Sequence, residues 1–209
     1  CLKNFRSANM AWYQGPVLMD HLESVEIDET RLGRRQFRMS VQWVNRPDQN
    51  FRGFAGEIAS GIVKPGARVR ILPSGRESSV ARIVTKDGDL QQAAAGESIT
   101  LTLADEVDCS RGDVIAQAGA PPEVADQFES TLVWMAEEPL LPGRPYWLKI
   151  GTRTVSASVT DIKHKVNVNT LEHLAAKTLG LNEIGECNLS LDQAVAFEPY
   201  ADNRDLGGF

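Results

Sequence analysis

The stretch from Gly53 to Ala118 constrains the fold of this chain more than any other part of its sequence. It strings together short runs of β-type residues that are separated by glycine-bearing turns. Lys64-Pro65-Gly66 has the proline and glycine placement of a type II turn, and valine and isoleucine alternate with arginine over residues 68–71. Short strands with turn signals about every 8–12 residues predict a barrel or a sandwich.

The residues before this stretch predict a short helix followed by a strand. Pro16 suits the first helical position, and Leu18, Leu22 and Val25 form one apolar stripe, so we expect a helix over Pro16–Ser24. Farther along, the apolar period changes to two, which predicts a half-buried strand whose inner face carries Phe37, Met39, Val41 and Trp43.

Helix and strand signals also occur near the C-terminal end. Asn169-Thr170 and Gly180 are residue types that start and stop helices, which predicts a helix over Leu171–Leu179. A strand is expected over residues 185–191. The last three residues, Gly207-Gly208-Phe209, would then lead towards a further strand.

The composition is that of an ordinary water-soluble globular protein. Hydrophobic residues make up 42% and charged residues 24% of the 209 residues, and the formal net charge is -6. No apolar run approaches the roughly 18 residues that cross a bilayer, and the first residues lack the apolar core of a signal peptide. The acidic balance disfavours nucleic-acid binding, which usually needs a basic patch. The cysteines are odd in number and far apart, which predicts reduced thiols in a cytoplasmic protein; they are Cys1, Cys109 and Cys187.

The sequence contains no convincing catalytic or cofactor-binding motif. A GTPase P-loop needs a Gly-Lys dipeptide, which is absent, and the D-x-x-G pattern at Asp205–Gly208 is short enough to match by chance. We therefore expect these residues alone neither to bind nor to hydrolyse GTP. His21, His164 and His173 lack the spacing of metal ligands, so we expect no metal site and no catalytic residue.

Two other features have a structural explanation that outweighs a functional one. Cys109 and Cys187 lie in β-type runs, where packing as small apolar residues is favoured over a nucleophilic role. Arg111-Gly112-Asp113 is better explained as a turn that enters a strand than as an adhesion motif.

Two surface features are candidates for a partner interface. Trp12 and Tyr13 would anchor a partner, since buried aromatic side chains dominate interfaces, but packing between domains of one chain is an equal alternative. A basic cluster would meet phosphate or an acidic partner, or would simply be a solvated strand start; it consists of Arg31, Arg34, Arg35 and Arg38.

Taken as a whole, residues 53–118 resemble the second, β-barrel domain of the elongation factor Tu-like GTPases. Longer runs resemble one family among them, the GTPase (large) subunit of heterodimeric sulfate adenylyltransferase, also called ATP sulfurylase. These runs are SANMAWYQGP (7–16), LMDHLE (18–23), NRP (45–47), FRG (51–53), PYWLK (145–149), KHKVNVN (163–169) and GLNEIG (180–185). Val17 departs from the family, which has a hydroxyl residue there, and the first six residues fit it poorly.

The resemblance implies a mainly all-β fold of two consecutive elongation factor Tu-like, six-stranded-type β-barrels with a short N-terminal helix. Residues 1–25 would be a connector and helix that follow an absent G domain, and residues 26–119 the first barrel. A linker over residues 120–127 would lead to a second barrel over residues 128–209, without its last strand.

The resemblance also implies a function for the longer parent protein. The parent would use GTP and magnesium to drive the synthesis of adenosine 5'-phosphosulfate from ATP and sulfate by a small catalytic subunit, in sulfate assimilation. In some members an adenylylsulfate kinase domain is fused to it. The barrels would be non-catalytic and cofactor-free, and would bind the catalytic subunit and the parent's own G domain. The alternative is a pair of tRNA-binding barrels from a translational GTPase.

Overall fold

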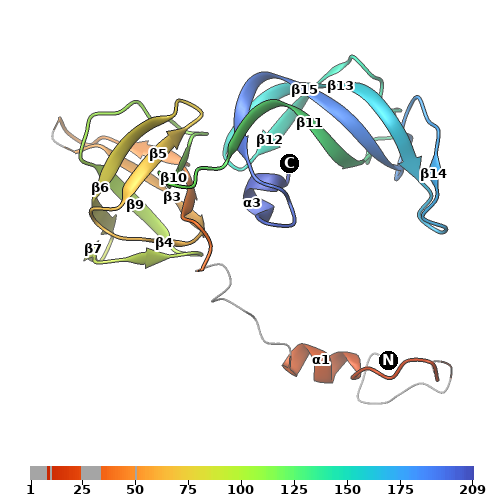
Figure 1. Ribbon diagram of the computed structural model, residues 1–209, viewed down its shortest axis with the longest axis horizontal. Helices are drawn as coiled ribbons and strands as arrows, with labels where there is room; N and C mark the ends of the chain where they lie inside the picture. Colours follow the sequence, from red (N-terminus) through yellow and green to blue (C-terminus); the bar gives the residue numbers. More distant parts are fainter. Residues whose placement is uncertain (1–8, 10, 25–33, 50) are drawn as a thin grey trace.

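The computed structural model describes residues 9, 11–24, 34–49 and 51–209 (Figure 1). Its first helix, α1 (Leu18–Ser24), lies inside the predicted Pro16–Ser24. No side chain of α1 is buried, and both Leu18 and Leu22 are exposed, so the described residues do not cover the expected apolar stripe. Val25, the third member of that stripe, lies outside the described residues.

The first β unit is a closed barrel of six antiparallel strands. In order around the barrel they are β1 (Arg38–Ser40), β10 (Val114–Gln117), β5 (Arg68–Leu72), β6 (Arg76–Thr85), β9 (Ser98–Leu103) and β3 (Gly53–Ser60). The ring closes because β1 pairs with both β10 and β3. Four short strands lie outside this ring, namely β2 (Trp43–Asn45), β4 (Ile62–Val63), β7 (Gly88–Leu90) and β8 (Ala93–Ala94).

Alternating apolar residues fill the interior of this barrel. Successive side chains of a strand point to opposite faces, so every second residue enters the core. Ile71, Ile83 and Leu101 come from three different strands and are all fully buried. Each such side chain contributes about 1.5–3 kcal/mol relative to an exposed one. The predicted barrel is thus the observed one, with inward residues where the period of two places them.

Trp43 is a correction to the predicted strand. Phe37, Met39 and Val41 are buried as expected, but Trp43 is 66% exposed. Strand β1 ends at Ser40 and β2 begins only at Trp43, and between them the Gln42 backbone N–H donates to the Ala55 carbonyl oxygen. The interruption breaks the alternation, so the next aromatic residue faces solvent.

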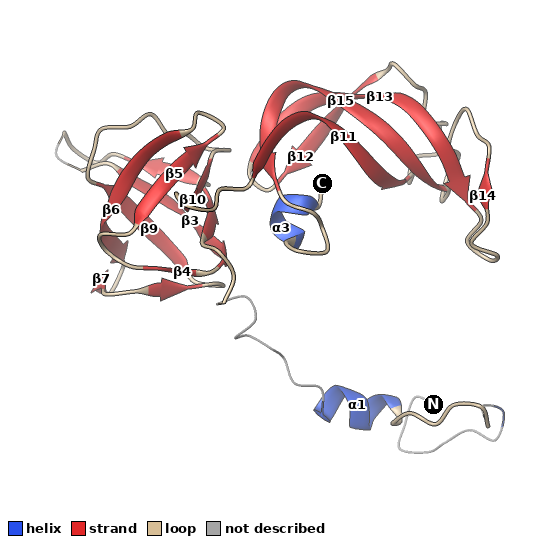
Figure 2. Ribbon diagram, in the orientation of Figure 1, coloured by secondary structure: helices blue, strands red, loops and turns tan. Residues whose placement is uncertain are grey.

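The second β unit is a strongly curved antiparallel sheet that arches over the C-terminal residues (Figures 1 and 2). Its strand order is β11 (Glu123–Val133), β15 (Ile184–Phe197), β13 (Arg153–Val166) and β12 (Pro145–Ile150), and β14 (His173–Leu174) pairs with β13. Among the described residues β11 and β12 are edges and do not pair with each other. Strand β11 starts at Glu123, so much of the segment predicted as a linker over 120–127 is already strand.

The helix predicted over Leu171–Leu179 is wrong. The Asn167 side chain accepts hydrogen bonds from the backbone N–H groups of Asn169 and Thr170 at 2.9 and 3.3 Å, so it holds a turn rather than a helix start. Leu171 follows at φ 61°, which is outside helical geometry. The chain then pairs with β13 through β14, because tertiary pairing outweighs weak local propensity.

The last residues form a short helix, α3 (Arg204–Gly207), where an approach to a strand was expected. Asn203 is its N-cap, and its side chain accepts a hydrogen bond from the Asp205 N–H at 3.1 Å. Leu206 is buried and packs towards the first barrel. Helix α3 is thereby placed at the junction between the two β units.

Across the described ranges, no helix is long and apolar enough to span a membrane.

Candidate functional site

The junction between the two β units holds a network of polar contacts among the described residues. Arg38 lies in β1, next to Met39, whose side chain fills the first barrel. Alternation therefore points Arg38 outwards, yet only 3% of it is exposed. The burial comes from the second unit, where Glu198 follows β15. The Arg38 Nε donates to Glu198 Oε1 at 2.8 Å, and a terminal guanidinium nitrogen lies 2.7 Å from the same oxygen.

The remaining polar atoms of this pair are also bonded. The second terminal nitrogen of Arg38 donates to the Phe37 carbonyl oxygen at 2.9 Å, and Asn203 Nδ2 donates to Glu198 Oε2 at 3.0 Å. The Glu198 backbone N–H donates to the Leu206 carbonyl oxygen at 3.1 Å. A buried ion pair is tolerated when hydrogen bonds satisfy both partners, and this network meets that condition.

A small apolar cluster lies at the same junction. Leu72, Val114 and Ala116 come from the first barrel, whereas Ala196 and Leu206 come from the second unit. All five side chains are buried, so water is excluded from this contact between the two units. The junction therefore combines apolar packing with oriented charge, which favours one relative orientation of the two units.

A second ion pair joins the units. Arg153 at the start of β13 contacts Asp113 Oδ1 at 3.3 Å and donates to Gln193 Oε1 at 2.9 Å. The Ser110 N–H donates to the other Asp113 carboxylate oxygen at 2.8 Å. Burial raises the pKa of Asp113 above its ordinary value, and the Ser110 hydrogen bond and the Arg153 charge only partly oppose this effect.

Gly112 allows Asp113 to reach this position. Its φ of 97° is unfavourable for other residues, and a Cβ there would lie 3.2 Å from the Cβ of Arg153. The Arg111-Gly112-Asp113 tripeptide thus forms the turn before β10, as the sequence indicated. Asp113 also forms the ion pair with Arg153 that joins the two units, and the sequence did not indicate this contact.

The predicted interface residues lie on the described surface but are not brought together. Trp12 is 74% exposed and packs edge-on against Tyr13, with 6.0 Å between ring centroids. Arg34 is exposed and Arg35 is half-buried. No described contact joins the aromatic pair to the arginines, and residues 25–33, which connect them and include Arg31, lie outside the described residues. Of the two alternatives left open for the basic cluster, the solvated strand start does not hold for Arg38, because the second unit covers it.

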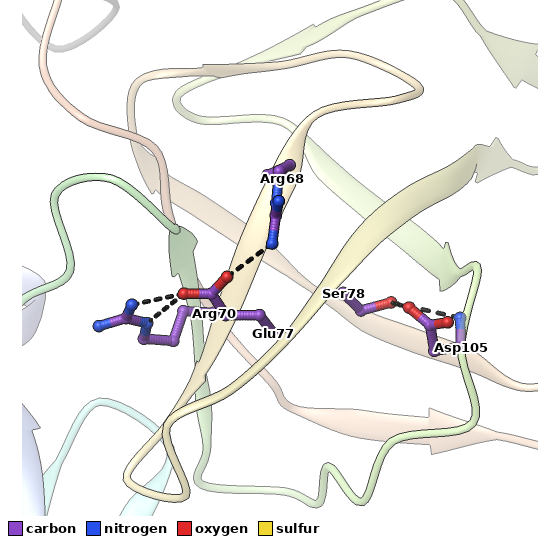
Figure 3. Close-up of polar contacts among 5 residues, drawn as sticks. All are labelled: Arg68, Arg70, Glu77, Ser78 and Asp105. Carbon is purple, nitrogen blue, oxygen red and sulfur yellow. Dashed lines mark hydrogen bonds and ion pairs between the residues drawn. The ribbon is translucent and has the colours of Figure 1, made fainter.

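The outer face of β5 and β6 carries a second polar cluster (Figure 3). Glu77 lies between two arginines: its Oε2 accepts from Arg68 at 2.8 Å, and its Oε1 accepts from Arg70. The hydrogen bond from Arg70 is the main cause that lowers the pKa of Glu77. On the opposite face of β6, the Oγ of the buried Ser78 donates to Asp105 Oδ2 at 2.8 Å and accepts from the Asp105 N–H at 3.2 Å. The latter pair ties β6 to the segment after β9.

The cysteines and histidines that the structure describes show no arrangement suited to catalysis. Burial raises the pKa of Cys109 to about 12 and that of Cys187 to about 11, so both thiols stay protonated and unreactive at neutral pH. His164 stacks on His173 with 3.8 Å between ring centroids, and its Nε2 lies 3.0 Å from Glu186 Oε2. Within the residues that the structure describes, no three His, Cys, Asp or Glu side chains could hold a metal ion.

The junction residues could not have been found from the sequence. Arg38 and Glu198 are 160 positions apart, and Asp113 and Arg153 are 40 apart. The sequence shows an arginine and an aspartate on the outer side of predicted strands, which is also typical of solvated residues. Only the position of the second unit shows whether such a residue is solvated or buried between the units.

Comparisons with known proteins agree with this architecture. Residues 127–209 match the family described as GTP-eEF1A C-terminal domain-like. A solved structure of sup35 complexed with GMPPNP superposes with a TM-score of 0.75 at 18% identity, over 98% of this chain and 51% of that chain. A closed six-stranded barrel followed by a curved antiparallel sheet thus gives this chain the fold of the β-barrel region of elongation factor-like GTPases. The predicted fold class is confirmed.

Relatives with high sequence identity give a more specific comparison than the structural match does. The chain is 55% identical to the bifunctional enzyme CysN/CysC of Xylella fastidiosa, over 98% of the chain and 33% of that protein. It is 50% identical to the bifunctional enzyme NodQ of a Rhizobium species, over 98% of the chain and 31% of that protein. It is 49% identical to sulfate adenylyltransferase subunit 1 of Aeromonas salmonicida, over 97% of the chain and 43% of that protein. The chain is thus similar over nearly its whole length to proteins of the sulfate adenylyltransferase family, the resemblance that its sequence indicated, and it spans about a third to two fifths of the length of these relatives.

Proposed function

We propose that this chain is the non-catalytic, partner-binding part of the GTP-hydrolysing subunit of sulfate adenylyltransferase. The observation that carries the proposal is an identity of 49–55% to relatives of that family over nearly the whole chain. The longer parent would use GTP and magnesium to drive the synthesis of adenosine 5'-phosphosulfate from ATP and sulfate. It would act in the cytoplasm, with an adenylylsulfate kinase domain fused to it in some proteins.

In this proposal the two β units transmit the nucleotide state of a G domain to a small catalytic subunit. Such coupling needs the GTP and GDP states to differ in their contacts with the barrels. A body that transmits a movement must itself be stiff. The two ion pairs and the apolar cluster at the junction support this role, because they resist rotation of one unit against the other.

The proposal includes the domain organisation expected from the sequence. The second unit would be a barrel completed by one more strand of the longer parent. Its support is the pair of sheet edges, β11 and β12, which border a groove of about 250 Å³ with an apolar lining that includes Leu132, Trp134 and Leu148. An open edge beside exposed apolar side chains is unfavourable unless another strand pairs with it.

The partner surface would include Trp12, Tyr13, Arg34 and Arg35. Exposed aromatic side chains make effective anchors, and arginines that have no partner among the described residues are available to carboxylates of another subunit. We assign no catalytic residue to the described chain, and we expect the isolated chain to have no adenylyltransferase or GTPase activity.

The test is co-purification of the chain with an affinity-tagged small catalytic subunit of a sulfate adenylyltransferase. Retention is expected, and it should weaken about tenfold or more when Trp12 and Tyr13 are both replaced by alanine. Trp43→Ala is the matched control, because Trp43 is similarly exposed but lies outside the proposed surface. Failure of both this chain and its longer parent to retain the subunit would overturn the assignment.

A further inference from the structure

A groove with a basic rim crosses the first barrel near the start of β1. We call it the Lys64 groove; it has a volume of about 630 Å³ and is lined by Phe37, Ile62, Val63, Lys64, Ala67, Arg68, Val69, Gln117 and Gly119. Its floor is formed by Phe37, Val63 and Val69, which are all buried against the barrel core. Ile62 is exposed at the lip. A groove of this kind offers a site for an apolar side chain of a ligand.

The rim of the Lys64 groove is positively charged. Lys64 is exposed, and its side-chain ammonium group has no hydrogen-bond or ion-pair partner in the part of the chain that the structure describes. Arg68, whose side chain is 74% exposed, shares the carboxylate of Glu77 with Arg70, so that two arginines face one acid (Figure 3). The rim therefore has an excess of cationic groups, although the whole chain has a net charge of -6.

Two further arginines precede the groove residue Phe37 in the sequence. The Gln36 carbonyl oxygen accepts a hydrogen bond from Ser60 Oγ at 2.7 Å, and Phe37, the next residue, lines the groove. Arg34 and Arg35 directly precede Gln36 and have no described partner. Lys64 and Arg68 thus place positive charge beside the apolar floor, although the chain as a whole is acidic.

We propose that the Lys64 groove docks an acidic segment of a protein partner that carries an aliphatic side chain between its carboxylates. The aliphatic side chain fills the apolar floor, and the carboxylates meet Lys64 and Arg68 at the rim. The lining favours a peptide over a nucleic acid, because single-stranded nucleic acids bind on exposed aromatic platforms. The only aromatic residue of this lining, Phe37, is buried.

The test is a fluorescence anisotropy titration of the whole chain with a short labelled peptide of alternating leucine and glutamate. Binding should weaken about tenfold for Lys64→Glu and should fall with added salt. Lys177→Glu is the matched control, since Lys177 is exposed, has no described partner and lies in the second unit. A thermal unfolding midpoint equal to that of the wild type shows that Lys64→Glu folds; otherwise Lys64→Gln, with an intermediate loss, replaces it.

Three comparisons can overturn the proposal. Equal affinity for a peptide of alternating serine and glutamate would show that the apolar floor does not contribute to binding. Tighter binding of a single-stranded RNA oligonucleotide, with competition against the peptide, would assign the groove to nucleic acid. An equal loss of affinity in Lys64→Glu and Lys177→Glu would show that binding depends on the net charge of the chain and not on this groove. The titration needs neither GTP nor a catalytic subunit, so its outcome is independent of the proposed sulfate adenylyltransferase function.

Discussion

Replacing Arg38 with methionine removes the guanidinium from the junction but keeps a long unbranched side chain in its place. The change leaves the Glu198 carboxylate without its cation, and removing one partner of a buried ion pair costs about 3–5 kcal/mol. The Glu198 side chain is 21% exposed and retains the hydrogen bond from Asn203. We therefore expect the free energy of unfolding to fall by about 3 kcal/mol, at the lower end of that range.

A double-mutant cycle separates the ion pair from the packing around it. Glu198→Leu alone leaves the Arg38 guanidinium buried and uncompensated, whereas Arg38→Met with Glu198→Leu leaves no lone charge. The double variant should therefore lose less stability than the sum of the two single variants, with a coupling energy of about 2 kcal/mol. The assay is urea unfolding followed by circular dichroism, with the free energy taken from the midpoint and slope of each curve.

Arg82→Met provides the control for this cycle. Arg82 pairs with Asp89 at 2.6 Å, but both side chains are about half exposed, so the loss should be much smaller than that for Arg38→Met. A cost for Arg38→Met as small as that of the control would refute the argument that the second unit desolvates this pair. Strict additivity in the cycle would refute direct coupling between Arg38 and Glu198.

Three other predictions concern the junction and the core. Leu206→Ala should lower the free energy of unfolding by about 2–5 kcal/mol in urea unfolding, because Leu206 is buried; a loss under about 1 kcal/mol would contradict this packing. Burial raises the folded-state pKa of Asp113, so the folded protein holds this proton to a higher pH than the unfolded chain does. The free energy of unfolding of the wild type, relative to that of Asp113→Asn, should hence fall as pH rises from the ordinary aspartate pKa through the raised one. Urea unfolding curves over this acidic range measure the difference. A difference that instead increases with pH would show that the Arg153 charge outweighs burial. Cys109 and Cys187, whose pKa values burial raises, should resist labelling by a thiol reagent until the protein is unfolded; rapid labelling of the native protein, followed by mass spectrometry, would argue against their burial.

The alternation of apolar residues made much of the fold predictable. The strand expected after the Arg111-Gly112-Asp113 turn is observed as β10, because a β-type run that follows a glycine turn predicts a strand from local sequence alone. The helix over Leu171–Leu179 failed for the opposite reason. Its start and stop residues are equally suited to turns, and pairing of β14 with β13 decided between them.

The candidate site was less predictable than the strands that hold it. The sequence indicated Trp12, Tyr13, Arg34 and Arg35 as surface features but gave no means to join them. For Arg38, which the structure places at the junction, the sequence left contact with an acidic partner and a solvated strand start open as alternatives. A single residue that points away from its own barrel carries the same sequence signal whether water or another domain covers it.

The sequence by itself determined most strands of the first barrel, its alternating core residues and the family that the chain resembles. These depend on residue order over short distances and on long runs shared with relatives. Only the tertiary structure decided which charged groups are buried, where the two β units meet and where a basic rim surrounds an apolar groove. Those properties arise when residues as far apart as Arg38 and Glu198 are brought within hydrogen-bonding distance, and no local pattern encodes that approach.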